Sequence, residues 1–140
     1  MSKAAIVYWS GTGNTELMAQ KVLEGARSAG AEAELFQAAD FSAARMAEFD
    51  AIAFGCPSMG AEQLEESEFE PMFTACRPML AGKRIALFGS YGWGDGEWMR
   101  TWEADCRADG AVLLAEPVIC NETPDADAQE ACMTLGRTLA

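Results

Sequence analysis

The 140-residue sequence contains no histidine, and it has few lysines and arginines. Ten basic residues stand against 22 aspartates and glutamates, which gives a net charge of −12. Without histidine the chain can use neither Ser-His-Asp nor Cys-His catalysis, and it can form no histidine metal site. Its acidity disfavours nucleic acid and anionic membranes as partners, because both attract clustered lysine and arginine.

The sequence also lacks paired cysteines and long hydrophobic runs. Its five cysteines are widely spaced and include no C-x-x-C pair, so neither a zinc site nor a disulfide framework is indicated. No apolar stretch approaches the roughly 18 residues of a membrane span, and the N-terminus lacks a signal-peptide pattern. We therefore expect an unanchored cytoplasmic protein with reduced thiols. Because half of the residues are hydrophobic, we expect a single folded domain over residues 1–140.

Short apolar runs alternate with longer segments of helical periodicity, which predicts a parallel sheet with crossover helices. Strands are expected at residues 4–9, 33–36, 50–55, 84–89 and 111–119. Helices are expected at residues 14–29, 66–80, 97–108 and 125–139, in a total of about five. The first strand is uniformly apolar and is placed centrally, whereas the second alternates and is placed nearer an edge. The fold class is therefore α/β, a doubly wound five-stranded parallel sheet with helices on both faces.

Ligands of such sheets bind beyond the carboxyl ends of the strands, so the loops after strands one, three and four matter most. The first loop combines two glycines with four hydroxyl or amide side chains and no basic residue: Ser10, Gly11, Thr12, Gly13, Asn14 and Thr15. A merely capped helix start would need only one hydroxyl residue and one glycine. The loop lacks the lysine of a P-loop, and Glu16 replaces the third glycine of the dinucleotide fingerprint. It predicts a phosphate cradle made of backbone and hydroxyl dipoles.

The second and third loops differ in how strongly each, considered alone, indicates a ligand site. The second contains Ser58, Met59, Gly60, Ala61 and Glu62. Gly60 permits either orientation of its peptide, but by itself this loop is better interpreted as an ordinary turn with a buried methionine. The third contains Ser90, Tyr91, Gly92, Trp93 and Gly94. Aromatic rings between glycines are suited to stacking on a planar ligand, so the loops together predict a site for a phosphorylated heteroaromatic.

Residues 6–16, 55–60 and 87–94 resemble the matching motifs of flavodoxins of the short-chain, clostridial type, in the same order and spacing. The resemblance covers essentially the whole chain and implies the strand order 2-1-3-4-5. It also implies non-covalent FMN, with the phosphate in the loop Ser10 to Thr15 and the ring between Trp93 and Met59. Glu62 would then accept a hydrogen bond from flavin N3, and the Gly60-Ala61 peptide would flip on reduction. The side chains of Ser58 and Ala61 are not expected to be essential.

The resemblance further implies an electron-transfer protein and not an enzyme, which agrees with the absence of acid-base residues. A carboxylate about 10 Å from a reduced flavin costs roughly 1.7 kcal/mol at an effective dielectric near 20. We therefore predict a low-potential carrier that cycles between semiquinone and hydroquinone. The acids Glu62, Glu65, Glu66, Glu68 and Glu70 are individually ordinary solvated residues, but as a group they predict transient electrostatic docking to basic-surfaced redox enzymes. A monomer is expected.

The sequence is compatible with three alternative functions. An FMN-dependent NAD(P)H:quinone reductase has the same fold but usually needs added loops and an oligomer interface. A phosphoacceptor receiver domain needs an aspartate at the end of the third strand, where this chain has Gly55 and Cys56. A cofactor-free interaction module would be colourless, so the visible spectrum of the protein separates it from a flavoprotein.

Cys56 is interpreted as a small packed side chain without a redox role.

Overall fold

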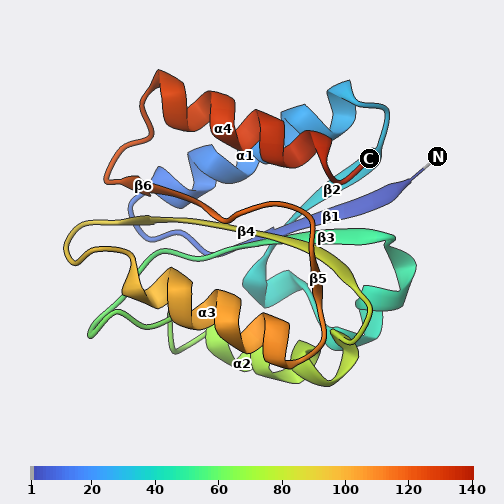
Figure 1. Ribbon diagram of the computed structural model, residues 1–140, viewed down its shortest axis with the longest axis horizontal. Coiled ribbons are helices and arrows are strands. Elements are labelled where there is room, and N and C mark those ends of the chain that lie inside the picture. The colour runs from blue at the N-terminus through green and yellow to red at the C-terminus, as the bar shows by residue number, and fades with distance from the viewer. Residues whose placement is uncertain (1) are drawn as a thin grey trace.

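A parallel sheet lies between two pairs of helices in the computed structural model, which describes residues 2–140 (Figure 1). Its strands are β1 (Lys3–Tyr8), β2 (Glu32–Gln37), β3 (Ala51–Gly55), β4 (Arg84–Tyr91), β5 (Val112–Leu113) and β6 (Val118–Asn121). They follow the order β2-β1-β3-β4-β5, and β6 also pairs with β4. Every pairing is parallel. The predicted fold class and strand order are confirmed, with β1 inside the sheet and β2 at its edge.

Helices α1 (Asn14–Ser28) and α4 (Ala126–Arg137) cover one face of the sheet, and α2 (Phe69–Cys76) and α3 (Glu97–Ala108) cover the other. Three short 3₁₀ helices complete the described elements: η1 (Ala38–Asp40), η2 (Ala43–Glu48) and η3 (Arg77–Met79). Residues 2–140 thus contain four α-helices, and the expected total of about five is too high. None of the helices in this range has the length and hydrophobicity to cross a membrane.

The predicted strand over residues 111–119 is divided in the structure. Val112 pairs with Arg84, and Val118 pairs with Phe88. The chain therefore passes six positions while β4 advances only four, so residues between β5 and β6 leave the sheet. Pro117 lies in that interval, and proline cannot donate the backbone hydrogen bond of a ladder. The sheet edge is consequently interrupted before it reaches the carboxyl ends of the strands.

Helix α2 is shorter than the predicted segment 66–80. The backbone amides of Ser67, Glu68 and Phe69 donate to the side chain of Glu65, so the chain turns there and the helix begins only at Phe69. At the other end the chain continues as η3, which contains Pro78. A proline inside an α-helix removes a hydrogen bond and clashes with the preceding turn.

Two hydrophobic cores lie on opposite faces of the sheet. The core beneath α2 and α3 is rich in aromatic residues, whereas the core beneath α1 and α4 is rich in alanine. The inner residues of β1, from Ala4 to Val7, are completely buried, as expected for a strand covered on both faces. Smaller side chains let α1 and α4 approach each other closely. The sheet thereby holds the carboxyl ends of β1, β3 and β4 together at one end of the molecule.

Candidate functional site

A cavity of about 380 Å³ lies where the loops after β1, β3, β4 and β6 meet. Eight of the predicted site residues line it: Gly11, Thr12, Asn14, Ser58, Met59, Ser90, Tyr91 and Gly92. Four further lining residues were not predicted: Trp9, Pro57, Glu122 and Thr123. No lysine or arginine of the described chain is among the lining residues. The cavity therefore offers hydroxyls, amides and aromatic surface to a ligand, but no cation.

The loop after β1 is shaped around the N-terminus of α1. Gly13 occupies the position before the helix with a φ of 95°, which is a left-handed conformation that glycine adopts without strain. Its amide donates to the Ser10 hydroxyl at 3.0 Å. Glycine has no side chain to cap the amides of the first helical turn, so these donors face outward from a positive helix end. This geometry is suited to an anion such as phosphate.

A buried pair of hydroxyl groups joins the first and third loops. The Thr15 and Ser90 side-chain oxygens lie 2.8 Å apart, and the two residues are almost completely buried. The Ser90 carbonyl accepts a hydrogen bond from the Ser58 amide at 2.9 Å, which joins the second loop to the same point. These hydrogen bonds fix the three segments relative to one another without a contribution from a ligand.

The second loop is a narrow turn with an exposed tip. Met59 and Gln63 exchange two backbone hydrogen bonds of 2.8 Å each. Between them Gly60 has a φ of 53° and Glu62 has a φ of 54°. The interpretation of this loop as a turn is confirmed, but its methionine is not buried, because the Met59 side chain is 37% exposed. A large apolar side chain is instead presented at the cavity.

Cys56 anchors the base of this turn. Its amide donates to the Phe88 carbonyl at 3.2 Å, and its own carbonyl accepts from the Trp98 indole at 3.2 Å. The sulfur accepts from the Glu65 amide at 3.3 Å. Burial raises the pKa of the Cys56 thiol to about 12, so it stays protonated at neutral pH. These contacts agree with the interpretation of Cys56 as a packed side chain.

Eight predicted residues do not line the cavity: Ser10, Gly13, Thr15, Gly60, Ala61, Glu62, Trp93 and Gly94. Ser10, Gly13 and Thr15 act through the hydrogen bonds described above. Trp93 is 61% exposed, so a planar ligand could still cover it. The Glu62 carboxylate accepts from the Glu97 amide at 3.2 Å, which places it against the N-terminus of α3 and away from the cavity wall. The cofactor roles assigned to these residues stay predictions.

The unpredicted lining residues come from three places, one of which is the loop after β3, where Pro57 lies. Trp9 is the residue after β1, and its indole donates to the Glu68 carboxylate at 3.0 Å. Glu122 follows β6 with a φ of 57°, and its amide donates to the Tyr91 carbonyl at 2.7 Å. Thr123 comes next along the chain. Reading the loop after the fifth strand by the same rule as the other loops would have found Glu122 and Thr123.

Comparison with known proteins gives one consistent result. The Flavodoxin family model matches residues 6–136. The sequence is 47% identical over 135 residues to the flavodoxin of Megasphaera elsdenii, covering 96% of each chain. It is 42% identical over 135 residues to that of Clostridium beijerinckii, covering 96% of this chain and 97% of the relative. The solution structure of two-electron reduced Megasphaera elsdenii flavodoxin matches with a TM-score of 0.89 and covers 97% of each chain.

Proposed function

The chain belongs to the flavodoxin family, whose members bind FMN and transfer electrons, and on that premise we propose a low-potential one-electron carrier. It would work between the one-electron-reduced and fully reduced forms of non-covalently bound FMN, and it would dock transiently on basic-surfaced redox enzymes. The observation that carries the proposal is the cavity lined by hydroxyls, amides and aromatics without a lysine or arginine in the described chain. When bound, the isoalloxazine ring of FMN supplies the redox chemistry.

The loop Ser10 to Thr15 fits the phosphate of FMN. The amides at the start of α1 and the hydroxyls of Thr12 and Ser58 are the groups that would donate to it. Hydrogen bonds from neutral donors to a phosphate are charge-assisted and therefore stronger than those between neutral groups. Phosphate binding by this loop consequently needs no cation.

The loops after β3 and β4 fit the ring. Met59 and Trp93 are exposed apolar side chains on loops that follow neighbouring strands, and a planar ring between them would cover both. For Glu62 to accept from flavin N3, its carboxylate would have to leave the Glu97 amide. That exchange replaces one N–H donor by another, so it costs little hydrogen-bond energy.

Gly60 is suited to the predicted peptide flip. A Cβ built at this position would meet nothing within 4 Å, so no neighbouring atom crowds that side of the residue. The flanking hydrogen bonds between Met59 and Gln63 do not involve the Gly60-Ala61 peptide, which can rotate while they stay in place. The Gly60 carbonyl would then accept a hydrogen bond from a proton at flavin N5.

Acidic surroundings would lower the potential of the second electron. Glu122 lines the cavity, and Glu62 and Glu68 contact the surrounding loops. Arg100, on the first turn of α3, is already paired with Asp95 at 2.9 Å. Each carboxylate about 10 Å from the fully reduced flavin opposes its negative charge by roughly 1.7 kcal/mol before screening by salt.

An anaerobic redox titration of the FMN-loaded protein tests this function. We expect two separate one-electron steps, with the second at the lower potential, and a spectrum of the one-electron-reduced state between them. A second potential equal to or above the first would contradict the proposal. Direct oxidation of NAD(P)H by the purified protein would instead support the quinone reductase.

We also propose a reducing compartment such as the cytoplasm. The five cysteines, all within residues 2–140, form no disulfide there, and four of them are buried. Burial raises the pKa of Cys132 to about 12, with a smaller contribution from Cys120. Titration of the freshly isolated, denatured protein with a thiol reagent should detect five thiols, and a lower number would argue for an oxidising compartment.

A further inference from the structure

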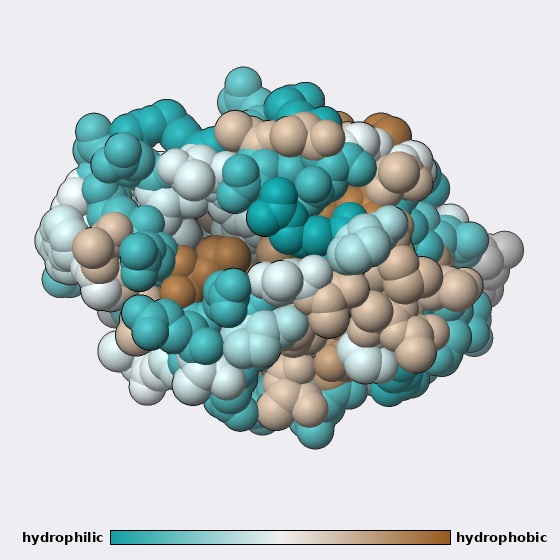
Figure 2. Space-filling view, turned by 90° about the horizontal axis from the view of Figure 1, so that it is seen from below, coloured by the Kyte–Doolittle hydropathy of each residue, from teal (hydrophilic) through white to brown (hydrophobic). Residues whose placement is uncertain are grey.

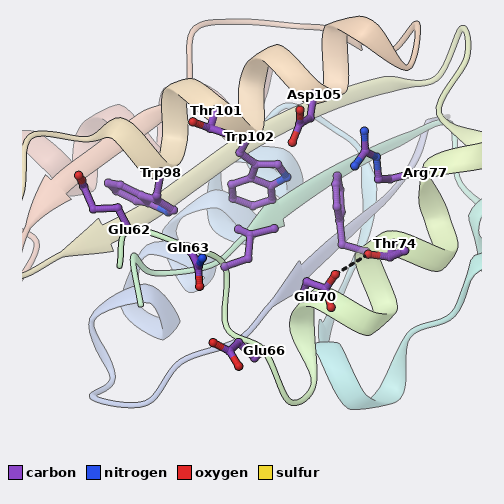
Figure 3. Close-up of a pocket in the computed structure, with 12 residues that line it drawn as sticks. Glu62, Gln63, Glu66, Glu70, Thr74, Arg77, Trp98, Thr101, Trp102 and Asp105 are labelled. Carbon is purple, nitrogen blue, oxygen red and sulfur yellow. Dashed lines mark hydrogen bonds between the residues drawn. The ribbon is translucent and has the colours of Figure 1, made fainter. Parts of the chain in front are cut away.

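A groove of about 560 Å³ separates α2 from α3 on the face of the sheet opposite to α1 and α4 (Figure 3). The first wall comes from α2 and η3, and the second comes from α3. The wall residues are Glu70, Phe73, Thr74 and Arg77 on the first side and Trp98, Thr101, Trp102 and Asp105 on the second. Both sets follow the spacing i, i+3, i+4, i+7, so each helix presents one continuous stripe to the groove.

The groove has an aromatic floor and an acidic rim. Phe73, Trp98 and Trp102 are almost completely buried at its base, and Leu64 is partly buried. Four carboxylates lie around it: Glu62, Glu66, Glu70 and Asp105. Figure 2 shows this face of the molecule, where hydrophobic atoms lie in a recess surrounded by hydrophilic ones. A volume of this size lies within the range of typical ligand-binding pockets.

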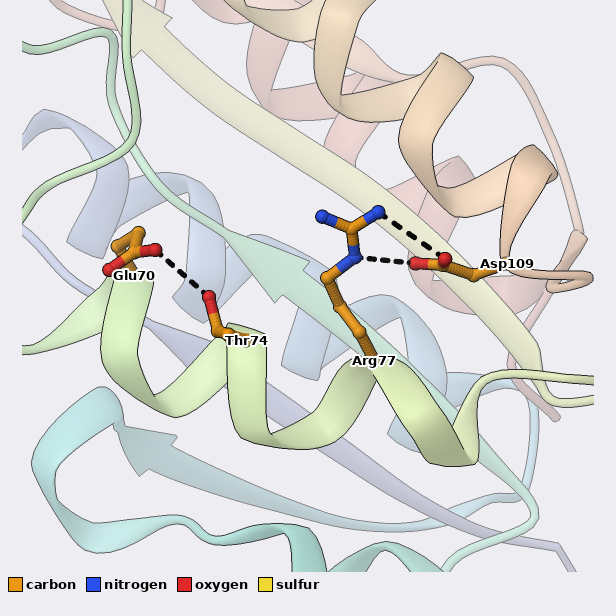
Figure 4. A network of polar contacts seen from close by, with 4 residues as sticks. All are labelled: Glu70, Thr74, Arg77 and Asp109. Carbon is orange, nitrogen blue, oxygen red and sulfur yellow. Dashed lines mark hydrogen bonds and ion pairs between the residues drawn. The ribbon is translucent and has the colours of Figure 1, made fainter.

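Arg77 does not neutralise the rim. Its guanidinium holds both oxygens of Asp109, with Nε 2.7 Å from Oδ2 and Nη2 3.3 Å from Oδ1 (Figure 4). Glu70 accepts a hydrogen bond from the Thr74 hydroxyl at 2.9 Å, which leaves its negative charge in place. Among the described residues that line the groove, Arg77 is the only cation and is already paired, so the four carboxylates favour a cationic occupant.

The floor also contains a donor without an acceptor. The indole nitrogen of Trp102 is buried and finds no nitrogen or oxygen acceptor among residues 2–140. The ring of Phe73 lies perpendicular to the indole, with 5.6 Å between the centroids, and a π face is a weak acceptor. In Figure 3 the nitrogen lies on the side of the indole ring toward Arg77. Because the nitrogen is buried, a carbonyl oxygen of an occupant would reach it only where side chains at the floor shift.

We propose that the groove docks a lysine- or arginine-bearing segment of a protein redox partner. Such a segment offers both cations to the rim and apolar side-chain stems to the floor, which a metal ion or an anion does not. One end of the groove is formed by Glu62 and Gln63, and Gln63 closes the turn that carries Met59. A segment in the groove thus places its protein beside the predicted flavin loop. The statement that the partner is a redox protein rests on the proposed function, whereas the argument for a cationic segment in the groove does not.

Titration of the isotope-labelled, FMN-loaded protein with a short blocked peptide of lysine and leucine tests the groove. We expect amide resonances of α2, α3 and residues 63–66 to shift, together with the Trp102 indole N–H, and the affinity to fall as salt is added. The double variant Glu66→Gln, Asp105→Asn should weaken binding by about tenfold, since it removes two rim charges. A peptide with glutamate in place of lysine should not bind.

The matched control is the double variant Glu34→Gln, Asp127→Asn, which removes the same two kinds of charge from exposed positions on β2 and α4. It should bind the lysine peptide with the affinity of the parent protein. Equal weakening by both variants, or shifts spread evenly over the surface, would overturn the groove as a specific site. FMN binding and the redox potentials are measured on the same samples. Failure of those measurements would contradict the proposed function and leave the peptide result to decide the groove separately.

Discussion

At the scale of single residues, a few buried polar side chains hold the loops of the candidate site. The side-chain hydroxyls of Thr15 and Ser90 form a hydrogen bond with each other at the base of the cavity. Glu65 is 6% exposed and accepts hydrogen bonds from Ser67, Glu68 and Phe69 at the start of α2. Its own amide donates to Cys56, at the base of the Met59 turn. These side chains couple the site to the core, so their replacement should be measurable as a loss of stability.

Replacing Thr15 with valine should lower the free energy of unfolding by about 1–2 kcal/mol, because it leaves the buried Ser90 hydroxyl without a partner. The double variant Thr15→Val, Ser90→Ala removes both polar groups and should be less destabilised than the sum of the single variants. Urea denaturation of protein stripped of FMN measures the cycle. Additive effects would show that the two hydroxyls do not interact.

Replacing Glu65 with glutamine should lower the free energy of unfolding by about 2 kcal/mol, because a carboxylate accepts these N–H and O–H groups better than an amide. Glu66→Gln is the matched control, since that neighbouring side chain is exposed and its change should stay within about 0.5 kcal/mol. Chemical denaturation at neutral pH compares the two variants. Equal losses of unfolding free energy in the two variants would show that removal of a negative charge, and not of the Glu65 hydrogen bonds, causes the effect.

Glu65 also predicts a pH dependence. Burial raises the pKa of its carboxyl, but the hydrogen bonds from Ser67, Phe69 and Glu68 outweigh burial and hold the pKa below the ordinary 4.5. Its stabilising contribution is therefore complete above the pKa of the unfolded chain and is lost as the pH falls through the lower pKa of the folded state. The stability difference between the parent protein and Glu65→Gln should shrink in that acidic range. A constant difference would contradict the prediction.

At the scale of elements, α1 and α4 pack at very short range because each contributes a glycine to the contact. A Cβ on Gly136 would collide with the Val22 carbonyl, and one on Gly25 would collide with the Met133 carbonyl. In each case the obstacle is backbone and cannot rotate away. The close crossing holds α4 against α1, whose first residue, Asn14, lines the candidate site.

Gly136→Ala should destabilise the protein by about 2 kcal/mol or more, although alanine favours a helix by up to about 1 kcal/mol over glycine. Thermal and urea denaturation measure the change. Gly92→Ala is the control, because a Cβ there meets nothing within 4 Å. A stabilised Gly136→Ala variant would show that the two helices can separate without cost.

At the scale of the whole molecule, we expect the net charge of −12 to steer encounters with charged partners. The association rate with a basic haem protein should fall by about tenfold or more as the Debye length drops from about 30 Å to about 8 Å. Stopped-flow reduction at several salt concentrations measures the rate. An acidic haem protein is the control, and its rate should rise with salt. Association rates that do not change with ionic strength would contradict electrostatic steering.

The central place of β1 and helices α1, α3 and α4 could be predicted because hydrophobic periodicity acts locally, whereas the strand order was implied by the resemblance to flavodoxins. The break between β5 and β6 could not, because it depends on register against β4. The start of α2 depends on the side chain of Glu65, which periodicity does not record. Eight of the predicted site residues line the cavity, since loops at the carboxyl ends of parallel strands converge.

The sequence by itself determined the fold class, the three motif loops and the acidic, histidine-free chemistry, because these depend on residue type and short-range spacing. Only the tertiary structure decided which loop residues face the cavity, and it added Trp9, Pro57, Glu122 and Thr123 to them. It also turned the Glu62 carboxylate toward the start of α3 and opened the groove between α2 and α3. These features join residues far apart in the chain, and their geometry is set by helix packing and strand register.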